Sequence, residues 1–473
     1  MSGGQRQGDG DGTASAGEYG KKASFLAIGV GLTGLITYAY FLIASHTLSK
    51  PDYGQITVLW SAVFITISTL YRPVEQLLSR HISERQVKGE SLTEPVRVAT
   101  RIQIGLALIF AVLALALRGP IEDGLLEGNE DLYWVFFGAV LFYAASYFAR
   151  GYLAGRGTFG TFTALILSES VFRTLFAVLV AIGLLSGQSA VAIGIVAAPS
   201  LSLLVVPLAF ARNTKKEQEA QQGVSAAPGR EAEDAAADTD FSMRHGSGFA
   251  AAVLVIMFSE QAFLNAGPIV IRALDGAAAA GFIFNVLMLA RAPLQLFQAV
   301  STSILPHLTS LHTSTDPDSE REFHRSIRGV LLGVAGFTAF TAVVVLIAGP
   351  QLMQLAFSAK FEYDRPGLLL ATLGMGLYLG AVTLNQACVA QGQVRRAAVR
   401  WISCAGFFIA WNFLPLIENE FRRVEIGFAL TAGVLFALLY LLYRHPHGRP
   451  EDIPKEGSTE ELELRLASID ENT

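Results

Sequence analysis

The chain has 473 residues, of which 52% are hydrophobic and only 16% are charged. Soluble globular proteins contain about 25% charged residues, so the composition excludes a soluble enzyme and a secreted disulfide scaffold. The net charge of −5 gives no basic surface for nucleic acid, and we expect no nucleic-acid partner. Cys388 and Cys404 both lie in apolar runs, which predicts buried hydrophobic side chains and no metal site or cofactor.

Apolar runs long enough to cross a bilayer recur along the whole chain. A hydrocarbon core of about 30 Å requires about 20 apolar residues in a helix. The runs predict an all-α polytopic membrane protein with about twelve spans: 23–46, 54–72, 99–118, 131–150, 158–185, 188–211, 247–272, 277–304, 328–348, 366–391, 398–416 and 424–443. Residues 1–22 are Gly-rich and polar, which predicts a disordered cytoplasmic arm before an uncleaved first helix.

The basic residues of the loops indicate the orientation of the spans. Lys and Arg gather in the loops that follow even-numbered spans, for example Arg80 and Arg85 after the second span. The loop after the third span is acidic, at 122–131. Because basic loops remain on the cytoplasmic side, we expect a multi-pass protein of the cytoplasmic (inner) membrane with both termini in the cytoplasm.

A polar stretch divides the spans into two sets of six. Residues 212–246 are rich in Ala, Gln, Glu and Asp, which predicts a mobile cytoplasmic linker between an N-terminal bundle (23–211) and a C-terminal bundle (247–443). Residues 444–473 are predicted to be an acidic cytoplasmic tail. A weak sequence similarity between spans 2 and 8 favours an internal repeat, although two hairpins of apolar helices can also look alike by chance.

Short motifs in a fixed order suggest a family. The first two spans are joined by the segment 48–54, the second ends in Glu75-Gln76-Leu77-Leu78-Ser79-Arg80, and Arg150-Gly151 through Gly155 joins spans 4 and 5. Arg291-Ala292-Pro293 and Leu305-Pro306 follow in and after span 8. From about residue 23 to 443 the chain resembles the polysaccharide-biosynthesis flippases, which move lipid-linked oligosaccharides, of the multidrug/oligosaccharidyl-lipid/polysaccharide (MOP) exporter superfamily.

The resemblance implies two pseudo-symmetric six-helix bundles around a central cavity that opens alternately to the two sides. It also implies a polyprenyl-pyrophosphate-linked oligosaccharide as cargo, for cell-surface polysaccharide export. Membrane lipid and other polysaccharide-assembly membrane proteins are the expected partners, and a proton or a sodium ion is the expected coupling ion. The long linker departs from the family pattern.

Ionisable residues within spans mark the candidate site, because each costs on the order of 3 kcal/mol at the bilayer centre. We predict cargo binding by Arg72, Arg173, Arg291, Asn265 and Gln295, and ion coupling by Glu75, Glu169 and Glu260. Arginine suits a pyrophosphate because its planar fork makes two bonds at once. The alternative interpretation is that the Glu169–Arg173 and Glu260–Arg291 pairs only neutralise each other.

Three other functions remain open at this level. The first is a small-molecule or drug exporter of the same superfamily. The second is a membrane enzyme of glycan assembly (a polymerase, ligase or glycosyltransferase), which the short outer loops argue against, so we expect no enzyme. The third is a peptidoglycan-precursor flippase, which typically has additional C-terminal spans. A non-transporting membrane scaffold is a further alternative.

Overall fold

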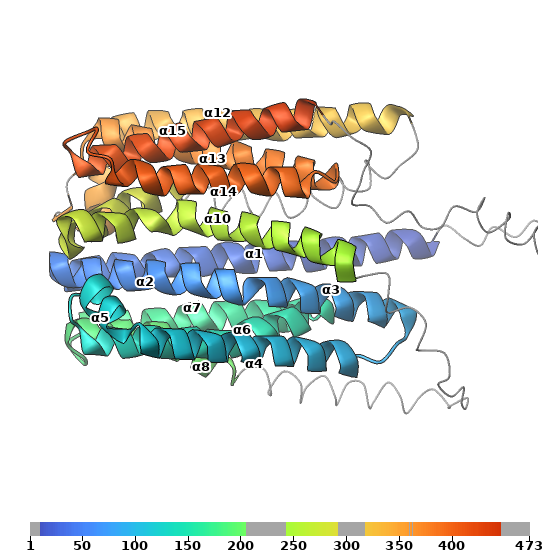
Figure 1. Cartoon of the computed structure of the whole chain (residues 1–473), viewed down its shortest axis with the longest axis horizontal. Helices are drawn as coiled ribbons and strands as arrows, with labels where there is room; N and C mark the ends of the chain where they lie inside the picture. Colours follow the sequence, from blue (N-terminus) through green and yellow to red (C-terminus); the bar gives the residue numbers. More distant parts are fainter. Residues whose placement is uncertain (1–9, 205–242, 292–316, 359, 362, 446–473) are drawn as a thin grey trace, which may run out of the picture.

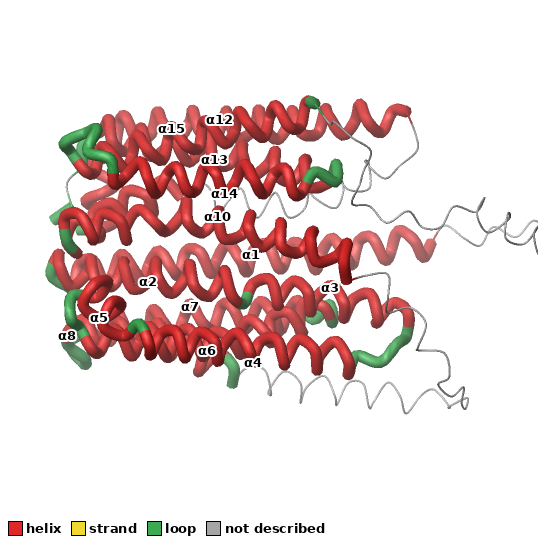
Figure 2. The backbone as a smooth tube through the Cα atoms, viewed as in Figure 1, coloured by secondary structure: helices red, strands yellow, loops and turns green. Residues whose placement is uncertain are grey.

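A computed structural model describes residues 10–204, 243–291, 317–358, 360–361 and 363–445. These residues form long helices joined by short loops, with no strand among them (Figures 1 and 2). The helices run nearly parallel in two groups that lie side by side (Figure 1). The predicted all-α, two-lobed membrane architecture is confirmed in these residues.

The N-lobe contains the helices that precede residue 205. They are α1 (Gly10–Thr47), α2 (Lys50–Leu70), α3 (Arg72–Lys88), α4 (Thr93–Ala116), α5 (Arg118–Leu126), α6 (Glu130–Gly155), α7 (Phe159–Ala181) and α8 (Gly187–Ser202). The C-lobe contains the helices that follow residue 242. They are α10 (Met243–Asp275), the helix Ala277–Arg291, α12 (Pro317–Phe357), α13 (Arg365–Ala390), α14 (Val394–Phe413) and α15 (Glu420–Arg444).

Each predicted span overlaps one of these helices. Within the described ranges, nine helices are long and apolar enough to cross a membrane, and Gly187–Ser202 and Ala277–Arg291 are shorter apolar helices. Most of the linker, the end of span 8 and the tail lie outside the described residues. The predicted bundle boundaries therefore remain predictions.

Three helices differ from their predicted extent. The helix α1 begins at Gly10, so the prediction of a disordered arm is wrong for residues 10–22; extending a formed helix is far easier than nucleating one. Span 2 ends with α2, as predicted, but a further helix, α3, follows directly: Pro73 lies in its first turn and has no N–H to donate to the preceding turn, which interrupts the helical hydrogen bonds. Part of the predicted acidic loop forms the helix α5, in which Arg118 binds Glu122 (2.8 Å).

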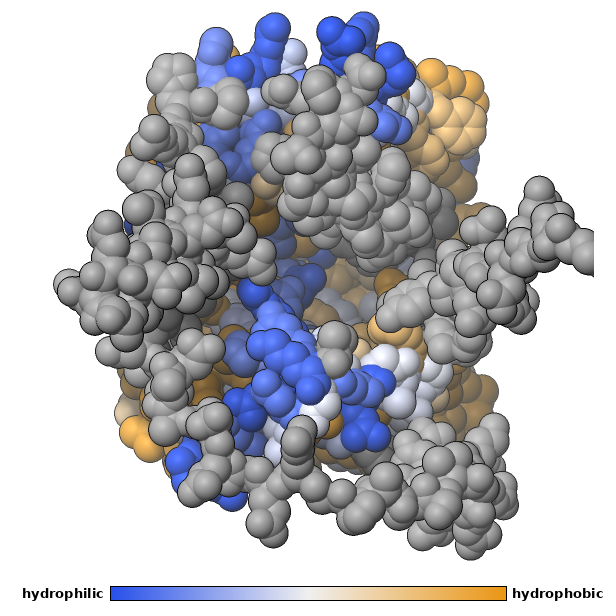
Figure 3. Space-filling view, turned by 90° about the vertical axis from the view of Figure 1, so that its right-hand side faces the viewer, coloured by the Kyte–Doolittle hydropathy of each residue, from blue (hydrophilic) through white to orange (hydrophobic). Residues whose placement is uncertain are grey.

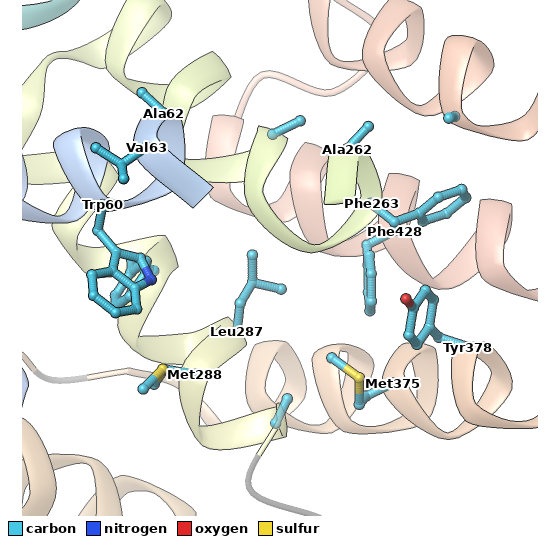
Figure 4. Packing of buried hydrophobic residues seen from close by; sticks show 14 of the residues in the cluster. Trp60, Ala62, Val63, Ala262, Phe263, Leu287, Met288, Met375, Tyr378 and Phe428 are labelled. Atoms are coloured by element: carbon cyan, nitrogen blue, oxygen red, sulfur yellow. The ribbon is translucent and has the colours of Figure 1, made fainter. Parts of the chain in front are cut away.

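The lobes pack through α2 and α10, and one hydrophobic core extends through both lobes. Trp60 of α2 and Met288 of the Ala277–Arg291 helix lie on either side of this contact (Figure 4). In the C-lobe, Phe263, Tyr378 and Phe428 form an aromatic cluster with ring centroids 6.1–6.5 Å apart. This cluster fixes α10 and α13 relative to each other.

The lobes touch closely at one end of the molecule, which we call the closed end. There α2 crosses the start of the Ala277–Arg291 helix at two glycines: a Cβ at Gly54 would lie 1.7 Å from the Ala277 carbonyl oxygen, and a Cβ at Gly281 would lie 3.0 Å from the Gly54 Cα. The opposite end carries the first residue of α1 and the last of α15 (Figure 1). Figure 3 shows its centre hollowed, with hydrophilic residues in the hollow, and we call it the open end.

Candidate functional site

Three charged side chains lie between the lobes without a hydrogen bond or ion pair to any described residue. They are Arg72 at the start of α3, Glu260 in α10 and Arg291 at the end of the Ala277–Arg291 helix, and all three are half-buried. The Nε atom of Arg291 is buried without a described partner. Unpaired charges at such a position are costly unless they face water or a ligand, so this is the candidate cargo site.

Two of these charges, Arg72 of the N-lobe and Glu260 of the C-lobe, interact across the lobe boundary. This interaction brings the N-lobe and C-lobe halves of the site together. All three charges act on the Tyr378 hydroxyl, and the charge of Arg291 also acts on that of Tyr38. Tyr38 also donates a hydrogen bond to the Met288 carbonyl oxygen from across the boundary.

The second group of predicted residues lies inside the N-lobe and is internally paired. The carboxylate of Glu169 is buried, accepts a hydrogen bond from Ser146 and forms an ion pair with Arg150. Arg173 is buried as well; its Nη2 donates to the Tyr143 hydroxyl at 3.0 Å. The guanidinium of Arg173 lies 4.5 Å from the centre of the Trp60 ring, a cation–π contact.

These contacts correct the predicted pairing. Glu169 and Arg173 do not bind each other, because the nearer partner of Glu169 comes from the neighbouring helix α6. The alternative that Glu260 and Arg291 form a mutual ion pair is also wrong for the described structure. Glu75 lies between Arg72 and Arg150 and so connects the two groups.

Two predicted residues do not contribute to the described site. The side chain of Asn265 is buried and donates to the Gln261 carbonyl oxygen (3.2 Å) and to Gln261 Oε1 (3.1 Å), within its own helix. Gln295 lies outside the described residues. The described cargo site therefore depends on Arg72 and Arg291.

Arg150 is a functional candidate that the sequence interpretation missed. The sequence predicts Arg150 at the edge of span 4, but α6 continues to Gly155. The sequence signal for Arg150 is the motif from Arg150-Gly151 to Gly155, whose glycines lie against α3. A Cβ at Gly151 would lie 2.7 Å from the Glu75 carbonyl oxygen, and a Cβ at Gly155 would lie 2.7 Å from the Ile82 Cβ. The two glycines let α6 approach α3, which positions Arg150 beside both Glu75 and Glu169.

A polar clamp at the closed end was also not predicted. The carboxylate of Glu127, which follows α5, accepts hydrogen bonds from Gln55 Nε2 (2.8 Å) and from the backbone N–H of Ala277 in the other lobe (3.2 Å). Arg272 of α10 donates to the carbonyl oxygens of Gly124 and Asp123. Glu127 therefore caps a C-lobe helix from the N-lobe.

Removing this clamp is expected to loosen the closed end. In Glu127→Ala the Ala277 N–H and Gln55 Nε2 lose their acceptor, and Arg272 loses a carboxylate 3.9 Å from its Nε. Because the site is partly exposed, we expect a cost of about 1 kcal/mol. Spin labels at Leu184 and Leu416, both exposed at this end, should show a larger population of long distances. Glu90→Ala, at the other end, is the matched control; an unchanged distance distribution in Glu127→Ala would show that the clamp does not hold the lobes together.

No family model and no curated protein matches the chain. Among solved structures, it is similar to the inward-facing conformation of a multidrug resistance MATE family transporter of the MOP superfamily (TM-score 0.63, 13% identity, covering 89% of this chain and 97% of that chain). The outward-facing conformation of a multidrug resistance MATE family transporter matches with TM-score 0.57 and 15% identity (89% and 94% covered). The chain has the fold of MATE transporters.

A eukaryotic MATE transporter, AtDTX14, has the same fold, with TM-score 0.60 and 14% identity over 89% of this chain and 94% of that one. At these identities the similarity establishes the fold only. The predicted superfamily architecture is thereby confirmed at the level of fold.

Proposed function

We propose that the protein is a flippase that moves a polyprenyl-pyrophosphate-linked oligosaccharide across the cytoplasmic membrane by alternating access. The observation that carries the proposal is a pair of arginines, one from each lobe: Arg72 and Arg291 have no described hydrogen bond or ion pair, and the charges of both act on Tyr378. A guanidinium binds a phosphate with two parallel hydrogen bonds. The pyrophosphate would lie between the lobes, and the lipid tail would remain in the bilayer beside them.

Glu260 is the proposed coupling residue. It has no hydrogen bond or ion pair to a described residue, and Arg72 is the charge that acts on it. A pyrophosphate that binds Arg72 competes for the same charge, so cargo binding and uptake of a proton or a sodium ion by Glu260 are linked. Glu75, which also lies beside Arg72, is the second candidate, whereas the ion pair of Glu169 with Arg150 favours a structural role.

The chain would lie in the inner membrane with its open end and both termini in the cytoplasm. The loop charges support this orientation, since basic loops remain cytoplasmic. In the described state the cavity would then be open to the side on which lipid-linked sugars are assembled. Cargo would pass to polysaccharide-assembly proteins at the opposite face.

The test is transport in vesicles. The purified protein is reconstituted in liposomes with a polyprenyl diphosphate that carries a short fluorescent oligosaccharide, and transfer between leaflets is followed by chemical quenching. Because charge-assisted hydrogen bonds contribute about 1.5–3 kcal/mol each, Arg291→Ala is expected to lower the rate by roughly tenfold to a hundredfold, and Arg291→Lys by less. Arg101→Ala, an exposed arginine of α4, is the matched control. Full transport by Arg291→Ala would overturn the proposal.

A drug exporter is the second candidate, and the unpaired carboxylate of Glu260 favours it, because it can bind a cationic organic molecule. The two arginines oppose such a cargo by charge repulsion. The two functions separate in the same vesicles: transport of an amphipathic amine that requires Glu260 but is insensitive to Arg291→Ala would favour the exporter.

A further inference from the structure

A polar stripe on α3 runs from Arg72 toward the open end. Residues four apart share one face of a helix and are about 6 Å apart along its axis. Arg72, Gln76 and Arg80 follow this spacing; Gln76 is exposed, and the Arg80 side chain is 70% exposed. The two arginines are therefore separated by about 12 Å along the helix.

The stripe borders the space between the lobes. The opposite face of α3 is buried, with Val74, Leu78 and Ile82 packed toward α4 and α6. Arg72 is turned toward the C-lobe, since its charge acts on Glu260 and Tyr378. Figure 3 shows hydrophilic residues lying in the hollow at this end.

Arg80 is held only by a weak and exchangeable partner. Its Nε lies 2.6 Å from an oxygen of Glu84, and the Glu84 side chain is itself 47% exposed. An exposed ion pair of this kind contributes about 0–1 kcal/mol. A diphosphate carries more charge and can bind the guanidinium with two bonds, so it can displace Glu84 at little cost.

We infer that Arg80 is a capture site at the mouth of the cavity, which binds the diphosphate of the cargo first and passes it along α3 to Arg72. The inference rests on the proposed function and assigns the order in which the arginines act. Arg80 raises the rate of association, because it is exposed and reached first. Arg72 lowers the rate of dissociation, because it is deep and unpaired.

The test measures both rates in the full-length protein in nanodiscs, with a fluorescent farnesyl diphosphate as the probe in stopped flow. Arg80→Gln is expected to slow association about three- to tenfold, with dissociation unchanged and a shallower dependence on salt. Arg72→Gln should instead accelerate dissociation. Glu84→Gln, which frees Arg80, should accelerate association, a change in the opposite sense that a folding defect does not produce. Arg101→Gln is the control.

Each outcome has a distinct meaning. If Arg80→Gln and Glu84→Gln bind at the wild-type rate while Arg72→Gln is impaired, the capture site is wrong and the proposed function stands. If the wild-type protein does not bind the diphosphate probe at all, the proposed function fails and this inference fails with it. Slower association in Arg80→Gln together with faster association in Glu84→Gln supports the capture site.

Discussion

Gly54→Ala is expected to abolish transport while leaving a folded protein in the membrane. The new Cβ would lie 1.7 Å from the Ala277 carbonyl oxygen and 2.4 Å from its carbonyl carbon. Overpacking usually costs about 1–3 kcal/mol, and here the obstacle is backbone, which cannot rotate aside. A cost near 3 kcal/mol would lower the population of the closed-end contact by roughly a hundredfold. A transporter that cannot close one end cannot alternate.

Two measurements distinguish a loss of the lobe contact from a loss of the fold. Spin labels at Leu184 and Leu416 should report a wide closed end in Gly54→Ala, and the melting temperature of the purified protein should stay near that of the wild type. Gly105→Ala, in a helix where nothing lies within 4 Å of the new Cβ, is the control and should transport normally. Normal transport by Gly54→Ala would show that the crossing does not have to close.

Glu169→Ala is expected to be the most destabilising substitution in the N-lobe. The Glu169 side chain is 3% exposed and its partner Arg150 is 16% exposed. Removing one member of a buried ion pair leaves an uncompensated charge, at a cost of about 3–5 kcal/mol. The melting temperature in detergent and the yield of folded protein should both fall.

The double variant Glu169→Leu with Arg150→Met should recover most of the loss, since replacing both members of a buried pair by apolar residues is often neutral. Glu84→Ala removes the exposed Arg80–Glu84 pair and should hardly change the melting temperature. A Glu169→Ala protein as stable as the wild type would mean that Arg150 finds another partner, for which Glu75 is the nearest acid.

The helices were predictable because hydropathy and helix length are local properties. The break at Tyr71 follows from Pro73 two residues later, and the predicted second span ended at this point. Helix α5 was missed because it has only nine residues, two glycines and a proline among them, and Arg118 forms ion pairs with Glu122 and Glu130 that hydropathy does not reveal. The positions of the charged residues within the spans can be read from the sequence. They led to the prediction that arginines of both lobes line one cavity.

The partners of those charges were not predictable from spacing. Spacing of four residues suggested that Glu169 binds Arg173, but its partner is Arg150, which reaches it from the neighbouring helix α6. Contacts between helices depend on the crossing of two backbones, which no single segment encodes. The clamp at Glu127 was hidden for the same reason, since its partner is a backbone N–H in the other lobe.

The helix α12 has 41 residues, so it is roughly 60 Å long, about twice the thickness of a bilayer core. Its packing within the C-lobe is mainly against α13, and Leu332, Phe340 and Ile347 project outward from it. Because α12 is so long, a small tilt of the C-lobe would displace the first turns of this helix by a large distance. Bilayer thickness, by favouring one tilt of this rod over another, would therefore bias which side of the transporter is open.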